Sequence, residues 1–124
     1  MKFLGAHDDN IGAGFLIPPH GVARPDHFKK IVASMEKRGW KGRRLVVVCD
    51  DTTGGMYRSL TGSHRIAAAG SLSISIPCRV LSFDKLDTHD AKQVFGWNNG
   101  YHELRHWIRK FDKQAARIFS WDLK

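Results

Sequence analysis

Residues 57–69 read YRSLTGSHRIAAA and predict a strand that passes through a glycine into a short helix. We expect the helix over Ser63–Ala69, closed by Gly70. The backbone N–H groups of a first helical turn have no partner within the helix, so they attract anions. Gly62 lets a phosphate group approach the backbone closely at this point. The stretch therefore predicts a phosphate-binding turn, although a capped helix with incidental polar residues fits the same pattern.

Three side chains in the first turn of this helix suit phosphate chemistry. Ser63 can cap the helix or donate a hydrogen bond to an oxygen atom. Arg65 can make a forked, charge-assisted contact with a phosphate group. His64 is the one group in the turn that can exchange protons near neutral pH.

The whole chain predicts one compact α/β (α+β) domain. The first dozen residues read as an irregular arm, and residues 14–17 as a brief edge strand stopped by prolines. Apolar spacing and β-branched runs predict the remaining elements. These are a helix over Asp26–Lys37, a strand buried on both faces over Leu45–Cys49, a hairpin partner over Met56–Leu60, a strand over Ile76–Ser82, a helix over Asp84–Phe95, a break over Gly96–Gly100 and a last helix from Leu104 to Ile118.

Composition fits a small globular protein. The chain has 124 residues, of which 42% are hydrophobic and 26% charged, which excludes disorder and leaves little room for a second domain. No apolar run approaches the roughly 20 residues of a membrane helix, and the acidic start MKFLGAHDDN is not typical of a signal peptide. Cys49 and Cys78 lie in apolar strand patterns and are expected as buried thiols in a reducing compartment. We therefore expect a cytoplasmic protein.

The net charge of +8 is unevenly placed. Residues 24–44 hold eight bases and two acids, and the last 24 residues hold six bases and three acids. Clustered positive charge favours a polyanion, such as nucleic acid, nucleotide phosphates or an acidic partner. A solvated basic face that only keeps the protein soluble is the alternative.

Individual basic residues are candidates for these contacts. Arg44 and Arg43 precede the strand at 45–49; we assign Arg44 to a nucleotide phosphate and Arg43 to nucleic acid, with a solvated turn as the alternative. The last predicted helix presents Arg105, Arg109 and Lys113, which can meet DNA through its phosphates without reading sequence.

Other polar and aromatic clusters carry weaker signals. Asp50 and Asp51 can hold a divalent ion such as Mg²⁺ beside a phosphate site, but Asp-rich turns are common. His102 and His106 have a zinc-binding spacing without an evident third ligand, so we expect a surface pair. The aromatic residues of the C-terminal third are expected in the core rather than stacked on bases: Trp97, Tyr101, Trp107, Phe111, Phe119 and Trp121.

Residues 61–69 resemble the ParB/sulfiredoxin superfamily. Its members share a glycine, two variable residues, an arginine, two more residues and an alanine, which fall here on Gly62, Arg65 and Ala68. The flanking helix and strands match as well, so the resemblance spans about residues 15–86. It implies a small mixed sheet flanked by helices, with an N-terminal arm over 1–14, a nucleotide-binding core over 15–86 and a C-terminal helical extension over 87–124.

The resemblance also implies a ligand. In the family this loop and helix start bind the phosphates of ATP or CTP, which implies phosphate contacts for Thr61, Gly62, Ser63, His64 and Arg65. Sulfiredoxins carry their catalytic cysteine where this chain has Ser63, so sulfiredoxin activity is not expected. Partition-type ParB proteins have Glu-Arg-Arg after the glycine, whereas this chain has Ser-His-Arg. The sequence therefore looks like a stand-alone core of the phage or plasmid type.

Two classes of function follow. The leading hypothesis is a nucleotide-binding domain that acts on or beside DNA. If it is an enzyme, hydrolysis of a nucleoside triphosphate or of a nucleic-acid phosphodiester is expected, with Arg65 stabilising developing charge and His64 orienting water or moving a proton. The alternative is a non-enzymatic basic adaptor that binds DNA or a protein. Phosphotransfer to a small molecule lacks a recognisable acceptor pocket.

Overall fold

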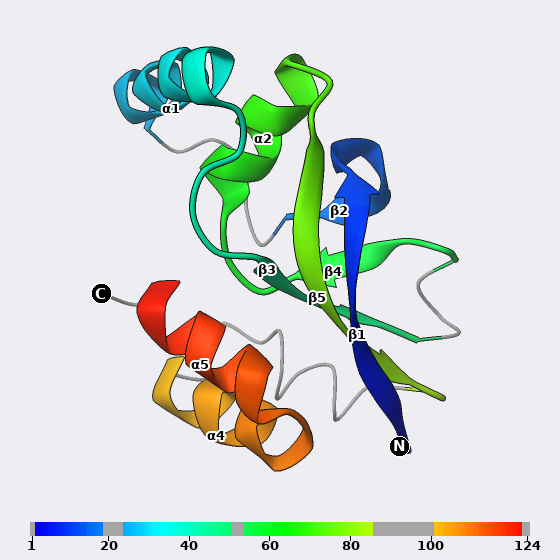
Figure 1. Ribbon diagram of the computed structural model, residues 1–124. Helices are drawn as coiled ribbons and strands as arrows, with labels where there is room; N and C mark the ends of the chain where they lie inside the picture. The colour runs from blue at the N-terminus through cyan, green and yellow to red at the C-terminus, as the bar shows by residue number, and fades with distance from the viewer. Residues whose placement is uncertain (1, 19–23, 51–53, 86–100, 123–124) are drawn as a thin grey trace.

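A five-stranded mixed sheet lies at the centre of the protein, with strand order β1-β5-β3-β4-β2 (Figure 1). The computed structural model describes residues 2–18, 24–50, 54–85 and 101–122, and in the last range the side chains of 106–119. The strands are β1 (Phe3–Gly12), β2 (Leu16–Ile17), β3 (Leu45–Cys49), β4 (Tyr57–Ser59) and β5 (Ser75–Phe83), and the helices are a 3₁₀ turn (Ala13–Phe15), α1 (Pro25–Arg38), α2 (Ser63–Ser71), α4 (Tyr101–Phe111) and α5 (Lys113–Asp122).

The pairing of the strands is partly parallel and partly antiparallel. β5 lies between β1, to which it is antiparallel, and β3, to which it is parallel. β4 is antiparallel to β3, which confirms the predicted hairpin. β2 pairs in parallel with β4 at the edge of the sheet, and this is the brief edge strand expected within residues 14–17. The predicted α+β class is therefore correct.

β3 is buried on both faces, as its continuous apolar run predicts. Leu45, Val46 and Val47 have no exposed surface, and Val48 is 1% exposed. Leu45 and Val47 belong to one core cluster, whereas Val46 and Val48 belong to the other. Because successive side chains of a strand point to opposite faces, the sheet carries a separate core on each side.

Each core is closed by one pair of helices, which Figure 1 shows as two separate groups. Met35 of α1 and Ile66 of α2 are buried in the cluster that contains Leu45. Ile108 of α4 and Phe119 of α5 are buried in the cluster that contains Val46. The molecule is thus a helix–sheet–helix sandwich in its described parts. No helix in those parts is long and apolar enough to span a bilayer.

The expectation of an irregular arm at the start of the chain is wrong. Residues Phe3–Gly12 form β1, which pairs with β5 along its whole length. The side chains of residues 7–10 are exposed because β1 is an edge strand, and Phe3 and Ala6 pack against the core. Polar and charged residues are common on edge strands, where they oppose pairing with another chain. The hydrogen bonds to β5 therefore form a strand from residues whose side chains do not alternate between apolar and polar.

The expectation of one continuous last helix is also wrong. The chain breaks at Asp112, between α4 and α5, and the Ala115 backbone N–H donates to Asp112 Oδ2 at 2.9 Å. Asp112 is therefore the N-cap of α5. The apolar spacing reads through the break because both helices turn apolar residues to the same face of the sheet. Asp84 and Lys85 are not helical, and the rest of the helix expected over 84–95, with the break over 96–100, lies outside the described residues.

Candidate functional site

The turn at Gly62 places a left-handed glycine directly before the first residue of α2. Gly62 is the N-cap of α2 with φ +84° and ψ 28°, in the left-handed region that favours glycine. A Cβ atom at this position would lie 2.9 Å from Leu45 Cδ2. The first helical hydrogen bond runs from the Ile66 N–H to the Gly62 carbonyl, at 2.8 Å. The N–H groups of residues 63–65 thus precede the helical ladder.

A buried hydroxyl holds the backbone just before this turn. Ser59 is 3% exposed, and its Oγ donates to the Thr61 carbonyl at 2.6 Å. Ser63, on the other side of the glycine, is 4% exposed, while Thr61 is half-buried. Ser59 was missed by the sequence predictions, because a serine at the end of a strand has no distinctive spacing.

His64 connects the first turn of α2 to the start of α1. Its Nε2 accepts a hydrogen bond from the Arg24 backbone N–H at 3.2 Å. Its ring also meets His27 edge to face, with 5.5 Å between the ring centroids. An accepting Nε2 carries no proton, so in this arrangement the proton of a neutral ring is on Nδ1. His64 therefore has a positioning role that the sequence did not predict.

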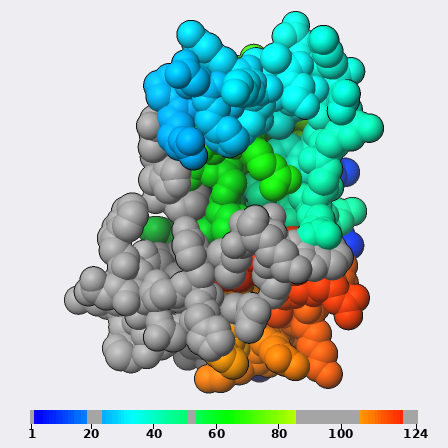
Figure 2. All heavy atoms as spheres, turned by 90° about the vertical axis from the view of Figure 1, so that its left-hand side faces the viewer, coloured from blue at the N-terminus to red at the C-terminus, as the bar shows by residue number. Residues whose placement is uncertain are grey.

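This contact brings the N-termini of two helices to one place. Arg24 is the N-cap of α1, and Pro25 occupies its first turn. A pocket of about 250 Å³ opens there, lined by Arg24, Pro25, Asp26, His27 and Lys30. Figure 2 shows this side of the molecule, where α1, in blue to cyan, borders the green surface of α2. Each helix N-terminus carries a partial positive charge, so the pocket favours an anion.

Arg65 holds the turn after α1 against α2. Its Nη2 donates to the Arg43 carbonyl at 3.0 Å, and its guanidinium carbon lies 4.2 Å from the centre of the Trp40 ring. The Trp40 Nε1 donates to the same carbonyl at 3.4 Å. A cation over an indole ring is attracted by the ring's electron-rich face. The contact of Trp40 with Arg65 was not predicted, because the two residues are far apart in the sequence.

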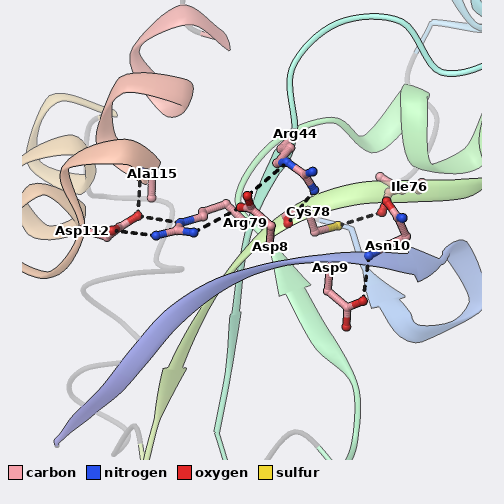
Figure 3. Close-up of polar contacts among 9 residues, drawn as sticks. All are labelled: Asp8, Asp9, Asn10, Arg44, Ile76, Cys78, Arg79, Asp112 and Ala115. Atoms are coloured by element: carbon pink, nitrogen blue, oxygen red, sulfur yellow. Dashed lines mark hydrogen bonds and ion pairs between the residues drawn. The ribbon is translucent and has the colours of Figure 1, made fainter.

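Arg44 is turned toward β1 in this structure (Figure 3). Its Nε lies 3.6 Å from Asp8 Oδ2, and its Nη1 donates to the Cys78 carbonyl at 3.5 Å. The structure therefore places Arg44 in a chain of ion pairs, and its assignment to a nucleotide stays a prediction.

Arg79 is the centre of this chain of ion pairs. Its Nε and Nη2 donate to the two carboxylate oxygens of Asp112, at 3.0 and 3.2 Å, and its Nη1 donates to Asp8 at 3.2 Å (Figure 3). The hydrogen bonds that Arg79 donates to Asp112 raise the pKa of Arg79. Burial opposes ionisation of Asp112, but Arg79 and the Ala115 N–H hold the pKa of that carboxyl below its usual value. These residues were missed because the strand that carries Asp8 was not predicted.

The predicted metal site is tested only in part. Asp50 is half-buried after β3, and Asp51 lies outside the described residues. Within the described part of the chain, no three side chains of His, Cys, Asp or Glu gather closely enough to hold a metal ion. Asp50 and Asp51 therefore stay a prediction for Mg²⁺. His106 is exposed, as expected, and the side chain of His102 lies outside the described residues.

The structure describes the side chains of some residues that were predicted to lie at the surface or in the core. Arg43, Arg109 and Lys113 are exposed, whereas the side chain of Arg105 lies outside the described residues. Both cysteines are free thiols, and burial raises the pKa of the Cys78 thiol to about 12. The core role of the C-terminal aromatic residues is confirmed for Trp107, Phe111 and Phe119, while Trp97 lies outside the described residues and nothing is described of the side chains of Tyr101 and Trp121.

Neither a protein-family model nor a curated protein matches the sequence. Solved structures are similar to it. The truncated chromosome-partitioning protein ParB from Caulobacter crescentus, complexed with CTP-γ-S, has a TM-score of 0.52 and 17% identity over 84% of this chain and 52% of that chain. Sulfiredoxin from Arabidopsis thaliana has a TM-score of 0.47 and 17% identity, over 64% of this chain and 86% of that chain. A Pnob8-like ParB-N domain has a TM-score of 0.42 and 15% identity, over 90% of this chain and 48% of that chain.

The chain spans about half the length of the two ParB structures. The likeness to ParB shows that it has a ParB/sulfiredoxin-like fold, with a mixed sheet flanked by helices. The resemblance of residues 61–69 to that superfamily is therefore confirmed at the level of the fold.

Proposed function

We propose that this protein binds a nucleoside triphosphate, ATP or CTP, with the phosphates between the N-termini of α1 and α2. The observation that carries this proposal is the hydrogen bond from the Arg24 N–H to His64 Nε2, which joins the two helix starts beside one pocket. The N–H groups of residues 63–65 are suited to donate hydrogen bonds to phosphate oxygens, and Gly62 keeps the backbone open to them.

The charge around the pocket supports the same ligand. Arg24 and Lys30 line it with two positive charges, and Asp26 contributes one negative charge. His27 and His64 add two rings that gain a positive charge when protonated. A site with several cationic donors and two helix N-termini is better suited to a polyphosphate than to a neutral sugar or base. The phosphates rather than the base are thus proposed to provide most of the affinity.

The fold supports the proposal by likeness. The ParB structure with the same fold was solved with CTP-γ-S. The present chain keeps the glycine and the motif arginine, as Gly62 and Arg65, and has Ser63 and His64 between them. Since Arg65 already contacts Trp40 and the Arg43 carbonyl, we propose that it supports the turn as well as the phosphates.

Hydrolysis of the bound nucleotide is a separate and finer proposal. His64 would orient water and Arg65 would stabilise developing charge. His64 Nε2 is bonded to the Arg24 N–H, so proton transfer at that atom requires the bond to open. A divalent ion would bridge phosphate oxygens and neutralise their charge, and Asp50 and Asp51 offer the carboxylate oxygens that Mg²⁺ prefers.

DNA is the macromolecular partner in this proposal, and a basic adaptor without nucleotide chemistry is the second candidate. The exposed Arg109 and Lys113 favour either function, because clustered cations bind a phosphate backbone. The two candidates differ in one respect. An adaptor binds DNA equally well with and without nucleotide, and its DNA affinity is insensitive to Arg65→Ala.

Titration calorimetry with ATP, with CTP and with Mg²⁺ tests nucleotide binding. Lys30→Gln removes a charge that lines the pocket, so we expect a Kd raised about three- to tenfold, since one phosphate contact contributes about 1 kcal/mol. Lys37→Gln is the matched control, because Lys37 is exposed on the last turn of the same helix. Absence of heat with both triphosphates, or equal effects of the two substitutions, contradicts the proposal.

A further inference from the structure

Four exposed cations surround the break between α4 and α5. Arg109 and Lys110 lie in the last turn of α4, and Lys113 and Arg117 lie one turn apart on α5. All four are exposed, and none of them makes an ion pair with another described residue. Four cations within nine residues, without an acidic partner among the described side chains, form a concentrated positive surface.

The fold turns these cations outward, away from the sheet. Ile108 and Phe119 are fully buried against the sheet, so the cationic sides of both helices face away from it. Lys113 and Arg117 are four residues apart and therefore lie on the same side of α5. Figure 2 shows α4 and α5, in orange and red, at the end of the molecule opposite α1.

The acidic residue between these cations, Asp112, is bonded to groups on the side of the sheet. Asp112 is the single Asp or Glu between residues 106 and 119. Arg79, which reaches it from β5, binds both carboxylate oxygens, and the Ala115 N–H binds one of them. The Asp112 side chain is 15% exposed and the Arg79 side chain 16%. The Asp112 carboxylate thus has its hydrogen-bond partners on the side of the sheet, and the neighbouring cations do not pair with it.

We propose that Arg109, Lys110, Lys113 and Arg117 form a contact surface for the phosphate backbone of nucleic acid, and that Arg79 is the positioning residue that keeps Asp112 out of that surface. This inference deepens the proposed association with DNA by naming where and how it occurs. It is independent of the pocket at the start of α1.

The chemistry of the surface favours nucleic acid over a membrane and over base-specific reading. The large exposed apolar residues among the described side chains are Leu4 and Phe15, which lie outside both helices, so no described side chain of this face is suited to enter a lipid layer. Trp107, Phe111 and Phe119 of these helices pack in the core, so they are not available to stack on bases. Contacts by Lys and Arg to phosphates are therefore expected to be independent of sequence.

Fluorescence anisotropy with a labelled duplex of mixed sequence tests the surface. We expect the double variant K113Q/R117Q to weaken binding about tenfold or more at moderate salt, and to reduce the slope of log K against log salt by about two. The matched control K29Q/K37Q removes the same charge from exposed positions of α1. Equal effects of the two double variants contradict a local surface. If poly-glutamate displaces the DNA, or if the protein binds anionic vesicles as tightly as it binds DNA, the surface has another partner and the proposal is contradicted.

A second set of variants tests Arg79. R79M leaves the Asp112 carboxylate without its partner beside the cations, so DNA binding weakens, and adding D112N in R79M restores it. A purely structural role of Arg79 would show no such rescue. D112N alone, which removes the acid, binds DNA at least as tightly as the unmodified chain; loss of binding in D112N overturns the role assigned to Arg79. Calorimetry with ATP and CTP on these variants stays unchanged, which separates this inference from the nucleotide proposal.

Discussion

Gly62 meets two independent constraints at a single position. Its φ of +84° lies where a side chain is strained, and an added Cβ would lie 2.9 Å from Leu45 Cδ2. Leu45 is fully buried at the start of the central strand, so it has little freedom to move away. The glycine is therefore required for close packing of α2 on β3 as well as for an open backbone at the proposed phosphate site.

Gly62→Ala is expected to lower the free energy of unfolding by about 2–4 kcal/mol, from left-handed strain and overpacking together. Urea denaturation followed by circular dichroism measures the change. Gly14→Ala is the control, because a Cβ at Gly14 meets no atom within 4 Å and its φ is not positive. A loss for Gly62→Ala no larger than for Gly14→Ala contradicts this account of the turn.

At the scale of elements, the sequence predicts those whose side chains carry their own signal. α1 and α2 begin and end within two residues of their predictions, because Pro25 and Gly39 mark the ends of α1 and Gly62 the start of α2. The prediction that Gly70 closes α2 is wrong, since Gly70 lies inside the helix and Leu72 is its C-cap. β3 matches its prediction because a run of apolar residues is needed where both faces are covered. The turn at Gly62 was predicted for the same reason, while its binding of phosphate stays a proposal.

Elements and contacts that depend on distant residues were not predictable. β1 is held by its ladder to β5, so its polar side chains show no strand pattern. The ion pair of Asp112 with Arg79 joins residues that are 33 positions apart in the chain. The contact between Arg24 and His64 spans 40 residues and has no local signal. Such pairs become visible only when the topology brings the strands and helices together.

The link between α5 and β5 gives a prediction for pH dependence. The folded-state pKa of Asp112 lies below its unfolded value of about 3.9, so its ion pair stabilises the protein above that pH and the contribution is lost as pH falls through the folded pKa. Asp112→Asn keeps a good N-cap and loses the charge, so we expect about 1–2 kcal/mol less stability at pH 7. Denaturant unfolding curves measured from pH 7 to pH 3 should show that the difference in stability between Asp112→Asn and the unmodified chain becomes smaller below about pH 4. A constant difference contradicts the ion-pair account.

At the scale of the whole molecule, the two proposed anion-binding sites lie on opposite faces of the sheet. On one face, which α1 and α2 cover, the start of α1 lines the basic pocket proposed for a nucleotide. The helices of the other face, α4 and α5, present the cations proposed for DNA. The net charge of +8 is therefore divided between surfaces that can be tested one at a time.

Backbone amide shifts on addition of nucleotide test the central proposal most directly. We expect ¹⁵N–¹H spectra of the full chain, titrated with CTP and with ATP, to shift the amides of Arg24, Asp26 and residues 63–65, with little change from 109 to 117. Arg24 is the most informative, because its N–H is bonded to His64 in the free protein. Saturable shifts at these two helix starts support the proposed site. Spectra without shifts, or with shifts confined to α4 and α5, contradict it.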